Sequence, residues 1–194
     1  MLPANIDWND TFNGLLEQFI QKNSSAWYMS PLLEYARKCE SVTEYGTFQG
    51  QTALLWLHAN VKQITCYDID FSECHKERLK EFAKINKQNI MFIPGDPFNY
   101  GVEETDMLFC DTKHTYERVH DELYFSHDTV RKYIAIHDTN YPAPHKRTLE
   151  FTRFPDELVK DAVKEFLRDH KEWTLDKEIN DNSGLMIIKR KDVI

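Results

Sequence analysis

The stretch from Leu108 to Leu123, LFCDTKHTYERVHDEL, places many ionisable side chains directly after three apolar residues. Asp111 and His114 lie three residues apart within it. A carboxylate is a hard ligand that suits Mg²⁺, Ca²⁺ or Mn²⁺, and a neutral imidazole accepts a proton near neutral pH. Two interpretations are open at this point: the edge of an active site, or a solvated loop that opens a helix.

Acidic residues lie at or beside the ends of five successive segments that read as strands: Glu44, Asp68, Asp96, Asp111 and Asp138. One Asp at a strand end would mean little, because Asp is common in turns and caps. Five in succession are harder to assign to turns. Since open parallel sheets bind ligands beyond the carboxyl ends of their strands, the pattern favours a functional site at this edge.

The first of these strands leads into a turn that contains Gly46 and Gly50, two of only six glycines in the chain. Their G-x-x-x-G spacing differs from the G-x-G-x-x-G of pyrophosphate-binding turns, and it favours an adenosyl ligand without phosphates. Asp68 follows Gly46 by about twenty residues, the offset of a carboxylate that binds ribose hydroxyls. Asp96 would then lie near the adenine amine, and Glu44 near the amino group of the ligand.

The elements that position these residues alternate along the chain. We predict strands at 41–46, 63–69, 89–96, 105–111 and 132–139, and a closing hairpin of 173–179 and 185–190. Apolar periodicity predicts helices at 10–22, 30–38, 51–59, 72–86, 115–130 and 154–169. The expected fold is therefore α/β: a Rossmann-like, doubly wound, mostly parallel seven-stranded sheet with a C-terminal antiparallel hairpin and helices on both faces.

Length and composition set wider bounds. The 194 residues favour a single domain overall, with an N-terminal helical segment (1–40) packed on an α/β domain (41–194). The formal net charge of -8 argues against a general nucleic-acid binder, and no apolar run or signal peptide indicates a membrane or secretory protein. The four cysteines form no C-x-x-C pair, so we expect unpaired thiols and a cytoplasmic location.

From Val42 to Lys189 the sequence resembles the class I S-adenosylmethionine-dependent methyltransferases. TEYGTFQGQTA is similar to the first motif of that family, CYDID to the second and PGDPF to the third. DMLFCDTKHTYERVHDEL and YIAIHDTN are similar to the D-x-x-H-x-Y and H-D-T signatures of one branch. That branch includes sugar O-methyltransferases and cephalosporin-hydroxylase-like proteins, some of which use a divalent metal. The chain departs from the family in having TVRKY where a Pro-Gly-Gly-type turn usually precedes the fifth strand.

The resemblance implies a methyltransferase that binds S-adenosylmethionine. The residues that it implies for the cofactor site are Glu44, Gly46, Thr47, Phe48, Gly50, Asp68, Ile69, Asp96 and Asp111. It also implies that Asp111 and Asp138 could hold a divalent metal. Their hard oxygen atoms suit Mg²⁺, Ca²⁺ or Mn²⁺, and His137 is an additional candidate ligand. Asp111 and His114 are the implied catalytic residues, with His114 as general base. Because His114 lies at a helix start, where the dipole disfavours a cation, we expect it to be neutral.

Several alternatives stay open. The leading function is O-methylation of a small hydroxylated acceptor such as a sugar; a metal-dependent hydroxylase or hydrolase, or a non-catalytic nucleoside-binding homologue, fits the same scaffold. Asp111 could instead cap a helix or bind the cofactor without metal. We expect no nucleic-acid or membrane partner, and an oligomer is open.

Other polar residues are assigned to the surface. Arg118, Asp121 and Glu122 are expected on a solvated helix face, and His75, His120, His127 and His170 on helix surfaces without identified partners. No insertion is long enough to form a substrate lid, unless the N-terminal helices or the segment 140–154 supplies the cover. His145–Arg147 is expected to be a solvated loop, and reception of an anionic substrate is the alternative.

Overall fold

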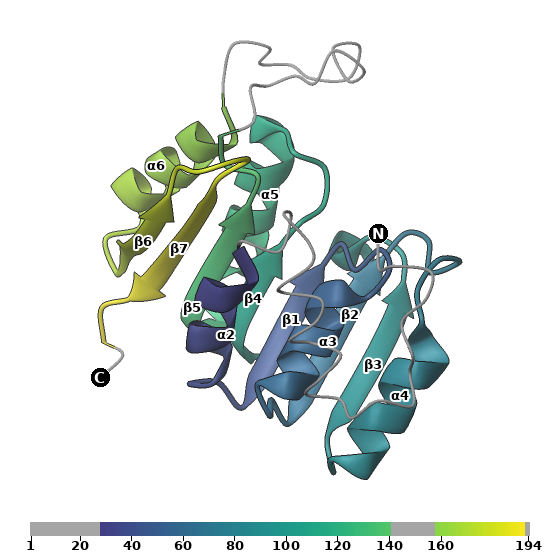
Figure 1. Ribbon diagram of the computed structural model, residues 1–194. Helices are drawn as coiled ribbons and strands as arrows, with labels where there is room; N and C mark the ends of the chain where they lie inside the picture. The colour runs from purple at the N-terminus through teal and green to yellow at the C-terminus, as the bar shows by residue number, and fades with distance from the viewer. Residues whose placement is uncertain (1–27, 141–157, 193–194) are drawn as a thin grey trace. The chain divides into compact units, whose positions relative to one another are not determined.

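The computed structural model describes residues 28–140 and 158–192. The predicted helix at 10–22, His145–Arg147 and nearly all of the segment 140–154 lie outside the described residues. Seven strands form one sheet in the order β3-β2-β1-β4-β5-β7-β6 (Figure 1). The chain divides into two compact units, residues 1–99 and 100–194, and each is described by itself. A single domain with boundaries at 1–40 and 41–194 stays a prediction.

Three parallel strands form the sheet of the first unit: β1 (Ser41–Tyr45), β2 (Gln63–Asp68) and β3 (Asn89–Pro94). Its helices are α2 (Met29–Ala36), α3 (Gln51–His58), α4 (Lys76–Ile85) and the 3-10 turn η2 (Pro97–Asn99). α3 packs against both α2 and α4, and its residues from Thr52 to Leu57 are all buried. The links from β1 to α3 and from β2 to α4 begin at the carboxyl ends of the strands, where the predicted cofactor residues lie.

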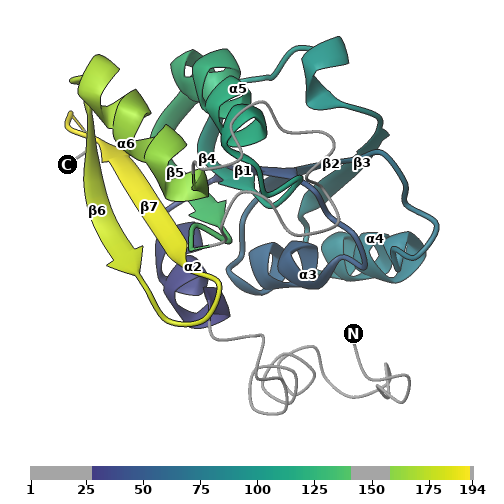
Figure 2. The same ribbon diagram turned by 90° about the horizontal axis from the view of Figure 1, so that it is seen from above.

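The second unit contains the remaining four strands: β4 (Thr105–Cys110), β5 (Val130–His137), β6 (Trp173–Ile179) and β7 (Leu185–Arg190). β4 and β5 are parallel, and β7 runs antiparallel to both β5 and β6. Its helices are α5 (Tyr116–Ser126), η3 (His127–Thr129) and α6 (Val159–Asp169). α5 and α6 pack side by side (Figure 2), and every residue of β4 is buried.

The fold confirms the predicted α/β class, the seven-stranded sheet and the C-terminal antiparallel hairpin. Three helix boundaries differ clearly from the sequence prediction. The helix expected at 154–169 begins at Val159, because Leu158 is extended, with a ψ of 156°, and forms the N-cap. The helix expected at 72–86 begins at Lys76, because Asp70 accepts hydrogen bonds from the amide and hydroxyl of Ser72 and holds a local turn there. The helix expected at 115–130 ends at Ser126, and β5 begins directly after η3.

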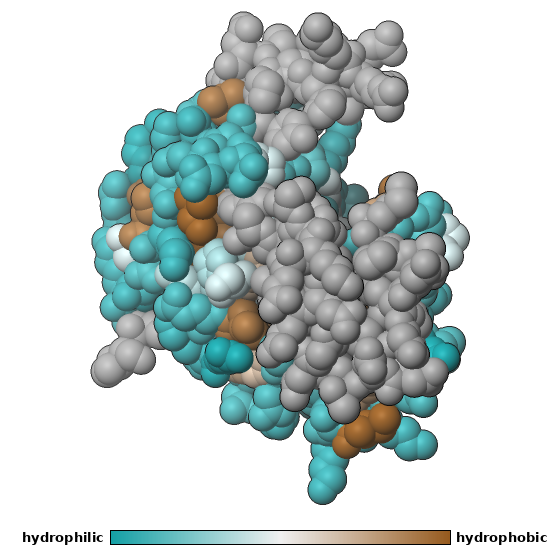
Figure 3. Space-filling model, viewed as in Figure 1, coloured by the Kyte–Doolittle hydropathy of each residue, from teal (hydrophilic) through white to brown (hydrophobic). Residues whose placement is uncertain are grey.

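The four cysteines are free thiols, with Cys39, Cys66 and Cys110 buried and Cys74 partly exposed, as the sequence predicted. Within residues 28–140 and 158–192, no helix has the length and apolar character needed to cross a bilayer. In the view of Figure 3 the described residues present mainly hydrophilic surface, with hydrophobic residues in small separate groups. The acidic composition is consistent with this surface.

Candidate functional site

The turn between β1 and α3 has an unusual backbone. Gly46, Phe48 and Gly50 have φ angles of 82°, 47° and 86°, and a positive φ is uncommon for an aromatic residue. A Cβ added at Gly50 would lie 2.6 Å from Cδ1 of Leu79 and 3.2 Å from Sγ of Cys74. Glycine is therefore required at Gly50 both by its backbone angle and by the packing of α4 against the turn.

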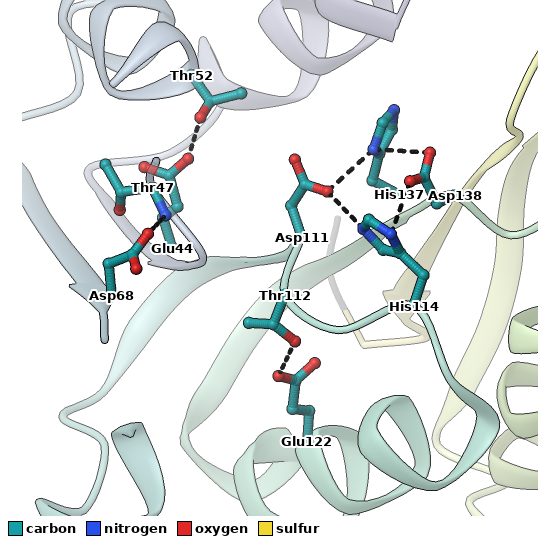
Figure 4. A network of polar contacts seen from close by, with 10 residues as sticks. All are labelled: Glu44, Thr47, Thr52, Asp68, Asp111, Thr112, His114, Glu122, His137 and Asp138. Carbon is teal, nitrogen blue, oxygen red and sulfur yellow. Dashed lines mark hydrogen bonds and ion pairs between the residues drawn. The ribbon is translucent and has the colours of Figure 1, made fainter. Parts of the chain in front are cut away.

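Asp68 holds this turn from the end of β2. Its Oδ2 accepts a hydrogen bond from the amide of Thr47 at 2.8 Å (Figure 4) and another from the amide of Phe48 at 2.7 Å. Its Oδ1 accepts a third from the amide of Asp70, at 3.0 Å. A carboxylate offers about four lone-pair positions, so a pair of ribose hydroxyls would replace at least one of these backbone donors. The structure thus joins Asp68 to the glycine turn, as its offset in the sequence suggested.

Glu44, in β1, is fully buried. Its carboxylate accepts hydrogen bonds from the hydroxyl of Thr52 (Figure 4) and from Sγ of Cys66, the latter at 3.4 Å. Burial, followed by the negative charge of Glu44, raises the pKa of the Cys66 thiol well above its ordinary value, so the thiol stays protonated and can donate. In this arrangement Glu44 supports the base of the turn, and a direct contact with a ligand would require its cover to move.

Asp96 and Ile69 lie beside the same strand ends. Oδ1 of Asp96 accepts a hydrogen bond from the amide of Phe98 at 3.1 Å, and the amide of Gly95 donates to the carbonyl of Asp68 at 2.8 Å. Ile69, directly after Asp68, is 84% exposed. The first unit therefore brings together the glycine turn, the carboxylates of Asp68 and Asp96, and the exposed apolar side chains of Phe48 and Ile69.

In the second unit, Asp111, His114, His137 and Asp138 form one cluster whose ligand atoms all lie within 4.8 Å of one another. Parallel pairing of β4 with β5 sets Cys110 opposite Ile136, so the residues that follow on the two strands meet. His114 comes from the link that leads into α5. The sequence predicted each of these four residues, and the structure brings all of them together (Figure 4).

Each histidine of this cluster contacts both carboxylates. Nε2 of His114 lies 3.1 Å from Oδ1 of Asp111, and its Nδ1 lies 3.0 Å from Oδ2 of Asp138. Nδ1 of His137 lies 3.0 Å from Oδ1 of Asp111 and 3.1 Å from Oδ1 of Asp138. Asp138 has a φ of 58°, a conformation that Asp tolerates better than most residues.

The charges within the cluster differ from the sequence prediction. Burial acts to lower the pKa of His114, but its hydrogen bonds to Asp111 and Asp138 outweigh burial and raise the pKa to about 10. Burial acts to raise the pKa of Asp111, but hydrogen bonds from the two histidines hold it well below its ordinary value. The expectation of a neutral His114 is therefore wrong for the metal-free arrangement: two adjacent carboxylates outweigh one helix N-terminus, whose effect is about 0.3–1 kcal/mol at an exposed position.

The donor set of the cluster fits a divalent cation. Carboxylate oxygens suit Mg²⁺, Ca²⁺ and Mn²⁺, whereas imidazole nitrogens shift the preference toward transition metals such as Mn²⁺. Ligands on opposite sides of a six-coordinate ion with bonds of about 2.2 Å lie about 4.4 Å apart, and the four ligand atoms here lie within 4.8 Å of one another. Among the predicted ions, Mn²⁺ matches the mixed donors best.

A buried ion pair supports the loop that carries Asp111 and His114. Glu122, on α5, is fully buried, and it accepts a hydrogen bond from the hydroxyl of Thr112 at 2.6 Å (Figure 4). It also accepts one from Nε of Arg118 at 2.6 Å. Burial raises the pKa of Glu122 above its ordinary value. The sequence interpretation placed Glu122 on a solvated face, which is wrong. Its helical spacing from Val119 and Ser126, both buried, was the signal that would have found it.

Thr115 caps α5 by accepting a hydrogen bond from the amide of Arg118 at 3.3 Å. Asp111 is therefore not the cap of this helix, and that alternative is removed. The carboxylate of Asp111 is engaged by His114 and His137 instead.

Comparison with known proteins finds solved structures whose backbones are similar to that of this chain. No protein-family model matches the chain, and no curated protein matches it. The methyltransferase PaMTH1 of Podospora anserina, bound to S-adenosylhomocysteine, has a TM-score of 0.62 and 15% identity over 94% of this chain and 88% of its own. The O-methyltransferase TomG of Streptomyces achromogenes, in complex with S-adenosylmethionine, has a TM-score of 0.63 and 15% identity over 93% and 90%.

A third solved structure extends the similarity to lower identity. The magnesium protoporphyrin IX methyltransferase of Synechocystis, with bound S-adenosylhomocysteine, has a TM-score of 0.63 and 9% identity over 95% of this chain and 97% of its own. These matches cover nearly the full length of both chains at low sequence identity, so the similarity is one of backbone structure and not of sequence. The chain therefore has the fold of these methyltransferases.

Proposed function

We propose that the chain is an S-adenosylmethionine-dependent O-methyltransferase that acts on a small hydroxylated acceptor such as a sugar. The observation that carries the proposal is the positive-φ turn after β1, in which two backbone amides donate hydrogen bonds to the carboxylate of Asp68. Solved structures with the same fold hold S-adenosylmethionine or S-adenosylhomocysteine. Since one of them is named for magnesium protoporphyrin IX, the fold does not identify the acceptor.

The first unit would bind the cofactor. The carboxylate of Asp68 would give up a hydrogen bond from a backbone amide and accept hydrogen bonds from the ribose hydroxyls. The exposed side chain of Ile69 offers an apolar surface for adenine. Gly46 and Gly50 give the turn beside the ligand its positive φ angles, and Gly50 also lets α4 pack against it. Asp96 would accept a hydrogen bond from the adenine amine. Glu44, Thr47 and Phe48 complete the predicted set. When bound, the cofactor supplies a sulfonium methyl group as the electrophile.

The second unit would serve the acceptor. An alcohol is a weak nucleophile near pH 7, so its proton must be removed as the oxygen attacks the methyl carbon. Asp111, His137 and Asp138 would hold a divalent ion, which lowers the pKa of a hydroxyl bound to it. His114 would take the proton, and the products would be a methyl ether and S-adenosylhomocysteine. Because His114 accepts a proton only when neutral, the charge of its two carboxylate partners must be balanced by another cation. A role for Asp111 in cofactor binding stays a prediction.

Calorimetric titration with S-adenosylhomocysteine tests the proposal. We expect binding by the native chain, and binding about 10- to 100-fold weaker in Asp68→Asn, because a hydrogen bond to a charged group is worth about 1.5–3 kcal/mol. Asp70→Asn is the matched control: the carboxylate of Asp70 bonds Ser72 and not the turn, so this variant should bind normally. Absence of binding by the folded native chain would refute the proposal.

Turnover assays separate the alternatives. A hydroxylase or hydrolase would turn over with metal and without consuming the cofactor, and a non-catalytic homologue would bind the cofactor without methylating any acceptor. Methylation that His114→Ala abolishes would exclude both. A cytoplasmic location and the absence of a nucleic-acid partner remain predictions from composition.

A further inference from the structure

A second group of metal-type ligands lies elsewhere in the second unit. His127 begins η3, which leads directly into β5, whereas His170 and Glu172 lie between α6 and β6. Asp138 follows the other end of β5, which has eight residues and therefore spans about 26 Å at about 3.3 Å per residue. This group is thus separate from the Asp111 cluster, and the proposed methyl transfer makes no use of it.

The three side chains converge on one carboxylate oxygen. Oε1 of Glu172 lies 3.2 Å from Nδ1 of His170 and 3.9 Å from Nδ1 of His127, and the centroids of the two rings are 4.1 Å apart. One ligand atom from each residue lies within 4.8 Å of the other two. Donors around a tetrahedral ion with bonds of about 2.1 Å are separated by about 3.4 Å, so these donors need only small movements to bind one ion.

The ring of His127 supplies an independent sign of a ligand. His127 is only 9% exposed, and its Nδ1 is a buried atom that makes no hydrogen bond to any described part of the chain. Oδ1 of Asp128 lies 3.3 Å away without the geometry of a hydrogen bond, on a side chain that is 86% exposed. Buried polar atoms are nearly always satisfied, so a nitrogen that faces His170 and Glu172 without a partner points to a bound group between them.

Packing fixes the two imidazole rings in place. The ring of His170 stacks on Phe166 with centroids 4.4 Å apart, and His127 contacts the same ring edge-on at 5.5 Å. Tyr124 contacts His170 edge-on at 5.1 Å. Because Phe166 is fully buried, both ligands are held by the core between α5 and α6, and little rotamer freedom would be lost on binding.

Charge and donor chemistry select the kind of ion. Two imidazole nitrogens and one carboxylate are typical ligands of Zn²⁺ and similar transition metals, and they are poor ligands for Mg²⁺ or Ca²⁺. The carboxylates of Glu172 and Asp128 are negative, whereas the guanidinium of Arg190 donates to the carbonyl of His127 at 3.2 Å and lies over the Trp173 ring.

We propose that His127, His170 and Glu172 form a Zn²⁺-type site, with water or Asp128 in the fourth position. The ion would join the link before β5 to the link before β6, which are 43 to 45 residues apart in the sequence. An ion that binds only the folded chain stabilises it by mass action, so the site serves stability rather than methyl transfer.

Zinc titration followed by calorimetry and thermal unfolding tests the site, starting from metal-stripped protein. Asp111→Asn/Asp138→Asn removes the first cluster, and Asn accepts the positive φ at position 138. In this background we expect one Zn²⁺ per chain and a rise in Tm of roughly 5–10 °C at a free Zn²⁺ concentration 100-fold above Kd. Adding Glu172→Gln should weaken zinc binding at least tenfold and abolish the rise. Adding Glu178→Gln, the same change at an exposed position of β6, should alter neither.

Stoichiometry in the otherwise native chain gives a second measurement that does not depend on the double variant. We expect Glu172→Gln, and also His170→Phe, which keeps an aromatic ring against Phe166, to bind one Zn²⁺ fewer per chain than the native protein. The proposal is overturned if the background variant folds without binding Zn²⁺, or if Glu172→Gln retains the native stoichiometry and Tm shift.

Discussion

Replacement of Gly50 by Ala tests how tightly the turn after β1 is built. An L-residue in the left-handed region costs about 1–2 kcal/mol, and the φ of Gly50 is 86°. The new Cβ would also lie 2.6 Å from Cδ1 of Leu79, which is 1% exposed and has little freedom to move. Overpacking of this kind costs about 1–3 kcal/mol. We therefore expect a total loss of about 2–5 kcal/mol in the free energy of unfolding.

Gly101→Ala is the matched control. Its φ is 74°, but an added Cβ would meet no described atom within 4 Å, so only the backbone cost of about 1–2 kcal/mol applies. Urea unfolding measures both variants. Gly50→Ala should also lower Tm by about 4–20 °C, given about 2–4 °C per kcal/mol for a chain of this size. Equal losses in the two variants would refute the packing argument, because they would show that Leu79 yields freely.

Three further predictions concern the second unit. Because the folded pKa of His114 is about 10, above its unfolded value of 6.5, its contribution to the stability of metal-free protein is fully present below pH 6.5 and is lost as pH rises toward 10. The pKa of Asp111 is lowered, so its contribution to stability is present above its unfolded pKa and is lost in acid. Urea midpoints measured against pH should therefore fall both in acid and at alkaline pH. His114→Gln should remove the fall at alkaline pH. Glu122→Ala should cost about 3–5 kcal/mol, because it removes a fully buried carboxylate that accepts hydrogen bonds from both Arg118 and Thr112. A loss below about 1 kcal/mol in urea unfolding would contradict the role of this pair. Asp138→Ala should be less stable than Asp138→Asn by about 1 kcal/mol, since Asn tolerates its φ of 58°, and equal unfolding midpoints would argue against strain at this position.

The strands and the residues at their ends were predictable from the sequence. Most strands are short apolar segments, whereas β6 was predicted from its place in the closing hairpin. The seven observed strands fall within two residues of the predicted limits at each end. Parallel topology then places the residues after successive strands at one edge of the sheet. For that reason the sequence could assemble Asp111, His114, His137 and Asp138 without a structure.

What the sequence did not predict depends on contacts between elements. The charge of His114 follows from two carboxylates on different strands, and no local pattern reports that geometry. His127 and His170 were assigned to helix surfaces without partners, but the packing of α5 on α6 brings them together beside Glu172. Glu122 is different, because the sequence interpretation missed a signal that was present: its helical spacing from buried residues of α5 indicates a buried position.

The hydrogen bonds from the glycine turn to Asp68 also bear on the thermodynamics of ligand binding. Fixing the backbone of one residue costs about 1–2 kcal/mol of conformational entropy, and the structure holds Thr47 and Phe48 in place through Asp68. Folding therefore meets this entropic cost before any ligand arrives. Association at the turn would exchange one set of hydrogen bonds for another in a preorganised site, so its rate would depend on diffusion and desolvation rather than on ordering of the loop.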